Sequence, residues 1–172
     1  MIEQPFRNIR GSQRYVAIAA AVTMDEFDVV GPLTGEVYEW LAQKGVVPSG
    51  PSFVRIWTSD MTAKLDIEVG VPVETPPNGD ERVIVGSIPS GSYVTLFYTV
   101  EEEGDHIQAN VEIQAWAANR GLEWQIDRSS GVDVWGGRFT FERPDKSSDG
   151  NQVFELTYQI IDKPADIRVS TE

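Results

Sequence analysis

The chain has 172 residues, of which 41% are hydrophobic, and it contains no cysteine. This length and composition suit one globular unit, and the lack of thiols excludes disulfides, thiolate metal sites and a cysteine nucleophile. With 27 acidic and 14 basic residues the formal net charge is −13, which opposes nucleic-acid binding because phosphate contacts need clustered lysine and arginine. The longest apolar run, YVAIAAAV at 15–22, is too short to span a bilayer, and the amino terminus lacks a signal peptide. We expect a cytoplasmic protein with no membrane or nucleic-acid partner.

In chain order, extended runs surround one amphipathic segment in the first half of the sequence. The extended runs at 5–10 and 14–23 come first, and apolar residues then recur at helical spacing until Gly45. A glycine at this position suits the left-handed residue that ends a helix. Further extended runs at 53–59 and 66–73 follow. The pattern predicts a strand, a helix and two more strands, with one extra strand in front.

The second half repeats this order. The corresponding segments are 81–88, 92–100, 111–122, 137–143 and 153–160. The two helical segments, GEVYEWLAQKGV and VEIQAWAANRGL, share a glutamate, a tryptophan, an alanine and a glycine at a constant offset of 76 positions. The last strands are 87 positions apart, so the second copy carries an insertion, which we place at 126–137.

These features predict an α+β fold, in which a duplicated strand-helix-strand-strand repeat forms antiparallel sheet around a pseudo-twofold central cleft. The expected single domain covers 1–162, with repeats at about 5–75 and 81–162, followed by a flexible tail at 163–172. The faces that the helices leave uncovered are expected to meet, and a groove between duplicated halves is a natural ligand site.

Two core strands, DIEVGVPV and VFELTYQI, each carry a glutamate at the third position. Strand alternation places Glu68 and Glu155 on the face away from the helices. Matching the apolar residues of neighbouring strands puts Arg55 opposite Glu68, but it puts Thr140 opposite Glu155. We therefore expect Glu155 to lack a fixed cation, and such a carboxylate takes up a proton or attracts a cationic ligand. The alternative is that both carboxylates are simply solvated or paired.

Aromatic rings and small side chains on the same face suit a flat hydrophobic ligand that carries a positive charge. Trp57, Tyr93 and Phe97 supply the rings, and Ala19 leaves room beside them. No metal site, cofactor or catalytic residue is assigned. The loop DKSSDGNQVFE resembles a calcium-binding loop, but its final glutamate comes one residue early, and a hairpin turn is preferred. The predicted ligand-binding residues are Glu155, Glu68, Trp57, Tyr93, Phe97, Ala19 and Arg55.

In order and spacing, the motifs GEVYEWLAQKGVVPSGPSF, DIEVGVPV, IPSGSYVTLFYTV, IQAWAANRGL and VFELTYQI resemble the gyrase-inhibitor-like (GyrI-like) effector-binding domains of multidrug-sensing transcription regulators. The resemblance covers nearly the whole chain. It implies two repeats around a cleft and a glutamate, here Glu155, that contacts cationic lipophilic compounds. No helix-turn-helix region precedes the domain, so we expect a stand-alone protein that binds or senses small molecules.

Two other functions stay open at this stage. The resemblance also allows an enzyme, because some stand-alone members of this family are similar to hydrolases that open strained cyclopropane-type rings of natural products, and a groove carboxylate would suit that chemistry. A gyrase-interacting protein is suggested by the family name alone.

Overall fold

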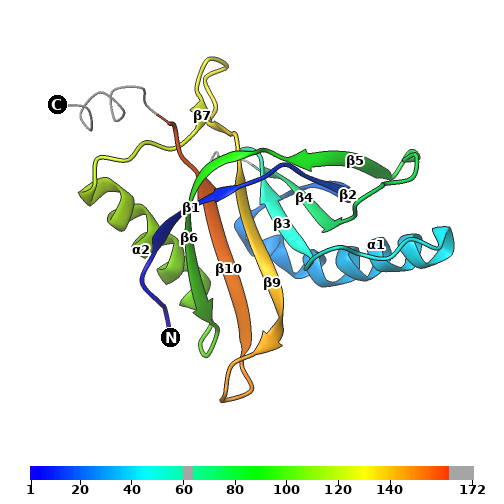
Figure 1. Ribbon diagram of the computed structural model, residues 1–172, viewed down its shortest axis with the longest axis horizontal. Coiled ribbons are helices and arrows are strands. Elements are labelled where there is room, and N and C mark those ends of the chain that lie inside the picture. Colours follow the sequence, from blue (N-terminus) through cyan, green and yellow to red (C-terminus); the bar gives the residue numbers. More distant parts are fainter. Residues whose placement is uncertain (60–63, 163–172) are drawn as a thin grey trace.

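The computed structural model describes residues 1–59 and 64–162 of the chain. Figure 1 shows a large curled sheet flanked by helices. The first half contains β1 (Phe6–Arg10), β2 (Gln13–Val22), a 3-10 helix (Met24–Val29), α1 (Val30–Lys44), β3 (Phe53–Ile56) and β4 (Leu65–Pro72). The second half contains β5 (Val83–Ile88), β6 (Gly91–Thr99), α2 (Asp105–Asn119), β7 (Ile126–Asp127), β8 (Val134–Trp135), β9 (Arg138–Lys146) and β10 (Gln152–Gln159). The tail predicted at 163–172 lies outside the described residues.

The sheet confirms the α+β class and the duplicated unit. Eight antiparallel strands run in the order β1-β6-β10-β9-β3-β4-β2-β5. The unit β2-α1-β3-β4 recurs as β6-α2-β9-β10, and the two units join where β3 pairs with β9. Each half also exchanges its leading strand with the other, because β1 pairs with β6 and β5 pairs with β2. The exchange brings residues from the start of the chain beside the last strand.

Both helices cover the same face of the sheet. Val37 and Leu41 of α1 are buried against Val16 and Val71 of β2 and β4, and α2 packs in the same way on β6 and β10. The stripes are those predicted by the 3.6-residue period. Gly45 follows α1 at a φ of 68°, the left-handed conformation expected there.

The predicted insertion forms a small two-stranded sheet of β7 and β8. The calcium-like loop is the turn between β9 and β10, as preferred from the sequence, with Gly150 at a φ of 81°. No helix within residues 1–59 and 64–162 combines the length and the apolar character needed to cross a membrane.

Candidate functional site

The face of the sheet opposite the helices curls on itself, and we call it the concave face. Contacts between strands that are not neighbours in the sheet show the curl. Arg55 of β3 donates a hydrogen bond from Nη1 to the carbonyl of Ser87 in β5, at 3.0 Å. The Arg10 guanidinium of β1 lies 5.4 Å from the ring centre of Phe141 in β9. The concave face therefore gathers side chains from both halves and both edges of the sheet.

The centre of the concave face is filled by a cluster made mostly of aromatic side chains. Its members are Tyr15, Ala17, Phe53, Ile88, Tyr93, Phe139 and Phe141, each at most 3% exposed. Of the predicted ligand residues, only Tyr93 belongs to this central cluster. A ligand on this face therefore lies to one side of the cluster or displaces part of it.

On the first-half side of the cluster, a tyrosine hydroxyl connects Glu68 to its arginine. Arg55 lies opposite Glu68 in the β3–β4 register, as predicted. The described contacts join the two residues through Tyr15, whose hydroxyl donates to Glu68 Oε1 at 2.5 Å and accepts from Arg55 Nη1 at 2.8 Å. Burial, followed by the neighbouring carboxylate, raises the pKa of Tyr15 well above its usual value, so its hydroxyl stays protonated.

On the second-half side, the expectation that Glu155 lacks a cation is wrong. Glu155 is 5% exposed and forms ion pairs with Arg10 and with Arg143, the latter at 3.3 Å between Oε1 and Nη1. The register is also shifted by one residue, since Glu155 faces Phe141 while Thr140 faces Leu156. The arginine from β1 comes from the exchanged edge strand.

The remaining predicted residues flank these two carboxylates. Trp57 stacks on Arg55, with the guanidinium carbon 3.6 Å from the ring centre. Ala19 lies directly opposite Glu68 and is exposed, whereas Phe97 lies opposite Glu155. The structure thus places Ala19, Arg55, Trp57 and Glu68 together in the first half, and Phe97 with Glu155 in the second.

Sequence reasoning missed Tyr15 and Arg10. Tyr15 had a usable signal, because it matches Tyr93 at the same place in the repeated strand, and both face the cluster. Arg10 had none, since only the exchange of edge strands brings it to Glu155.

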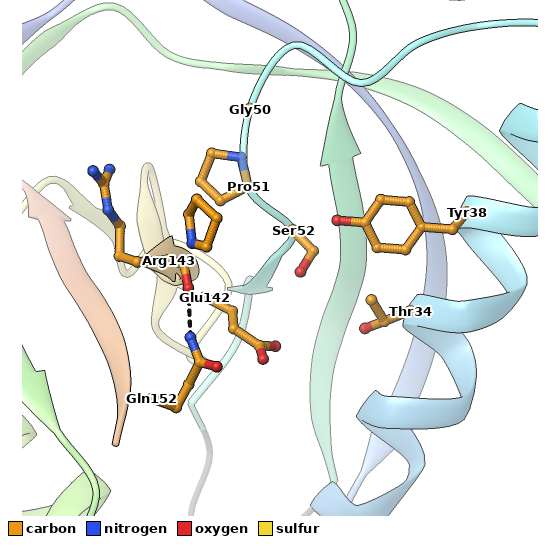
Figure 2. Close-up of a pocket in the computed structure, with 9 residues that line it drawn as sticks. Thr34, Tyr38, Gly50, Pro51, Ser52, Glu142, Arg143 and Gln152 are labelled. Carbon is orange, nitrogen blue, oxygen red and sulfur yellow. Dashed lines mark hydrogen bonds between the residues drawn. The ribbon is translucent and has the colours of Figure 1, made fainter. Parts of the chain in front are cut away.

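A separate pocket of about 480 Å³ opens on the helix side of the sheet, between α1 and the end of the β9–β10 hairpin. Figure 2 shows Thr34 and Tyr38 of α1 facing Ser52 and Glu142 across it, while the Arg143 side chain turns away. None of the ligand residues predicted from the sequence lines this pocket.

Sequence comparison alone does not place the chain. No protein-family model matches it, and no curated protein matches it in sequence. Structural comparison does find relatives of the fold. The EcmrR C-terminal domain aligns over 93% of this chain and 98% of its own length, with 12% identity and a TM-score of 0.72. EcmrR in a cryo-EM structure of the EcmrR–DNA complex aligns over 93% of this chain, with 12% identity and a TM-score of 0.74. The protein spans only 58% of the length of that EcmrR chain.

Two further structures share the fold. SAV2435 bound to tetraphenylphosphonium aligns over 99% of this chain and 100% of its own, with 9% identity and a TM-score of 0.61. A hydrolase from Listeria innocua aligns over 92% of each chain, with 11% identity and a TM-score of 0.56. At 9–12% identity these likenesses show the fold, and the duplicated α+β fold predicted from the sequence motifs is that of the EcmrR C-terminal domain and of SAV2435.

Proposed function

We propose that the protein binds small aromatic molecules, including lipophilic cations, on the concave face beside Glu155. The fold supports this proposal, because SAV2435 has a similar fold and was solved with tetraphenylphosphonium bound. Glu68, Trp57, Tyr93, Phe97, Ala19 and Arg55 are proposed as further ligand contacts.

The single observation that carries the proposal is the position of Arg10. Its guanidinium pairs with Glu155 and lies 5.7 Å and 5.4 Å from the ring centres of Tyr93 and Phe141. A buried carboxylate surrounded by aromatic faces is the combination that binds organic cations. In this chain the protein's own side chain occupies that place, at the end of an edge strand and 22% exposed. A cationic ligand would therefore bind by displacing Arg10.

Titration with rhodamine 123, a flat fluorescent cation, tests the proposal by fluorescence anisotropy. Arg10→Met removes the competing charge, and we expect it to tighten binding about tenfold. Glu155→Gln removes the countercharge and should weaken binding by a similar factor. Arg7→Met is the matched control, because Arg7 is exposed and lies on the other side of β1. The proposal would be refuted if the dye, at millimolar concentration, bound neither the unmodified protein nor Arg10→Met.

A second candidate function is hydrolysis of a strained, electrophilic ring, as in cyclopropane-type natural products. The hydrogen-bonded series Arg55–Tyr15–Glu68 favours it, and a hydrolase from Listeria innocua has a similar fold. Glu68 would accept a proton from water as the water oxygen bonds to a ring carbon. The ring bond breaks, and its electron pair passes to a conjugated carbonyl that is then protonated.

Mass spectrometry after incubation with such a substrate tests this candidate. The expected product is heavier by one water, and its formation should be lost in Glu68→Gln. Glu155→Gln is the comparison variant, because it leaves Glu68, the carboxylate proposed to activate water, unchanged. Formation of the product at the rate of the protein-free control would remove this candidate.

A further inference from the structure

Three buried hydrogen-bond donors on the concave face have no acceptor among the residues that the structure describes: Arg10 Nε, and the neighbouring Arg55 Nε and Trp57 Nε1. Arg55 is 3% exposed, and its terminal nitrogens donate to Tyr15, to the carbonyl of Ser87 and to the carbonyl of Gly136. Its Nε is left without a partner, and so is the indole Nε1 of Trp57. Leaving a buried donor unpaired costs free energy, so such groups usually mark a place for a missing partner.

The Arg55 and Trp57 donors belong to one stacked unit. Trp57 lies two residues after Arg55, and the indole ring covers the guanidinium at 3.6 Å. Arg55 is fixed by three hydrogen bonds, whereas the described part of the chain offers no hydrogen bond to the indole. Trp57 is also partly exposed. Because hydrogen bonds hold Arg55 in place, the indole is the member of the pair that can move. A shift of the indole would make both Arg55 Nε and Trp57 Nε1 accessible to a ligand.

The charges on the concave face point the same way. Among the residues that the structure describes, Arg10, Arg55 and Arg143 lie near two buried carboxylates, Glu68 and Glu155. Arg55 and Arg10 also bracket the stacked rings of Phe139 and Phe141, because Arg55 lies 5.0 Å from Phe139 and Arg10 lies 5.4 Å from Phe141. Glu155 lies at the Arg10 end of this row, and the two adjacent unpaired donors, Arg55 Nε and Trp57 Nε1, lie at the other end.

We propose that Arg55 and Trp57 form an acceptor subsite, so that the preferred ligand is an aromatic molecule that carries a carboxylate. This inference rests on the proposed binding function and narrows its ligand class. The acceptor group of the ligand takes a hydrogen bond from Arg55 Nε and another from Trp57 Nε1. Hydrogen bonds from a charged donor to a carboxylate are stronger than neutral ones, so the acceptor group contributes selectivity.

Two matched dyes test the inference. Rhodamine 110 carries a free carboxylate, and rhodamine 123 is its methyl ester, so the pair differs mainly in the charge and acceptor strength of one group. We expect the unmodified protein to bind rhodamine 110 about tenfold more tightly than rhodamine 123. Fluorescence anisotropy measures both dissociation constants under the same conditions.

Variants show whether the preference comes from this subsite. Trp57→Phe keeps a ring but removes the indole N–H, and it should reduce the ratio of the two affinities several-fold. Arg55→Lys keeps the charge but removes the planar set of donors, and it should reduce the ratio further; circular dichroism reports whether it folds. Trp116→Phe is the control, because Trp116 Nε1 is also unpaired but lies on α2, away from the concave face. The control should leave the ratio unchanged.

The outcomes separate this inference from the function on which it rests. Equal affinities for the two dyes, or a preference that survives in Trp57→Phe and Arg55→Lys, would overturn the acceptor subsite and leave small-molecule binding intact. Binding of neither dye would overturn the proposed function, and the subsite with it.

Discussion

In the first half of the chain, Ala17 of β2 lies opposite Gly70 of β4, whereas the equivalent positions of the second half place Thr95 opposite Thr157. The small pair makes room for the Phe53 ring, because a Cβ added at Gly70 would lie 2.6 Å from Phe53 Cζ. The threonine pair is instead joined by a hydrogen bond of 2.8 Å between the hydroxyls. The same backbone thus carries apolar packing in one copy and a polar pair in the other.

The next positions along these strands differ in the same way. Ala19 leaves Glu68 uncovered by a large side chain, and Phe97 stands opposite Glu155 in the second copy. Glu68 interacts with its arginine through Tyr15, while Glu155 is paired directly with arginines from β1 and β9. A repeated carboxylate therefore need not have a repeated environment, and the residue directly opposite it is small in the first copy and large in the second.

The largest effect is expected from giving Gly70 a side chain. Gly70→Ala forces a methyl group against the Phe53 ring and should lower the free energy of unfolding by about 3 kcal/mol. Urea denaturation followed by tryptophan fluorescence measures the loss. Thr157→Ala, at the matching position of the other copy, removes one hydrogen bond and should cost about 1 kcal/mol. If Phe53→Leu fails to restore stability in Gly70→Ala, the proposed clash is not the cause.

Neutralising the two glutamates should also give unequal losses. Glu155→Gln leaves two arginines without a countercharge and should cost about 2 kcal/mol. Glu68→Gln keeps an amide oxygen that accepts from Tyr15 and should cost about 1 kcal/mol. The midpoints of urea denaturation at pH 7 compare the variants. Equal losses would show that the direct ion pairs give Glu155 no special role in stability.

A bulky residue at position 19 tests which copy contacts the ligand. Ala19→Phe makes the first copy resemble the second, where Phe97 stands opposite the glutamate. A ligand beside Glu68 should then bind about tenfold more weakly, as measured with rhodamine 110. Ala115→Phe, at an exposed position of α2, is the control for an added ring. Unchanged affinity in Ala19→Phe would place the ligand on the Glu155 side.

The smallest effect concerns His106, which occurs in the second copy without a counterpart in the first. Its Nδ1 is hydrogen-bonded to the Tyr98 hydroxyl at 2.7 Å, and burial lowers the pKa of the imidazole. The unfolded chain therefore takes up this proton before the folded protein does, and stability should fall as the pH drops below about 6.5. Thermal unfolding between pH 7.5 and pH 5.5, as rough limits that bracket the usual histidine pKa, should show a smaller decline in His106→Gln. Parallel declines in the two proteins would contradict this assignment.

The strands, both helices and their buried faces could be predicted because each depends on local periodicity. The Arg55–Glu68 pairing was also correct, since one face of β4 is clearly apolar and the other is not. The β9–β10 pairing was predicted one residue out of register. Phe139 and Phe141 of β9 are buried on the concave face, so β9 has apolar residues on the side that was expected to be polar. Hydrophobic matching cannot assign register when both faces of a sheet are buried.

By itself, the amino-acid sequence determined the repeat, the element order and the two carboxylates that face away from the helices. The tertiary structure alone decided which cations meet Glu155. Arg10 and Glu155 are 145 positions apart and meet because β1 crosses to the edge of the other half. Side-chain periodicity indicates which face of a strand is buried. Strand exchange and sheet curl depend instead on contacts between distant segments, and such contacts leave no periodic pattern in the sequence of either segment.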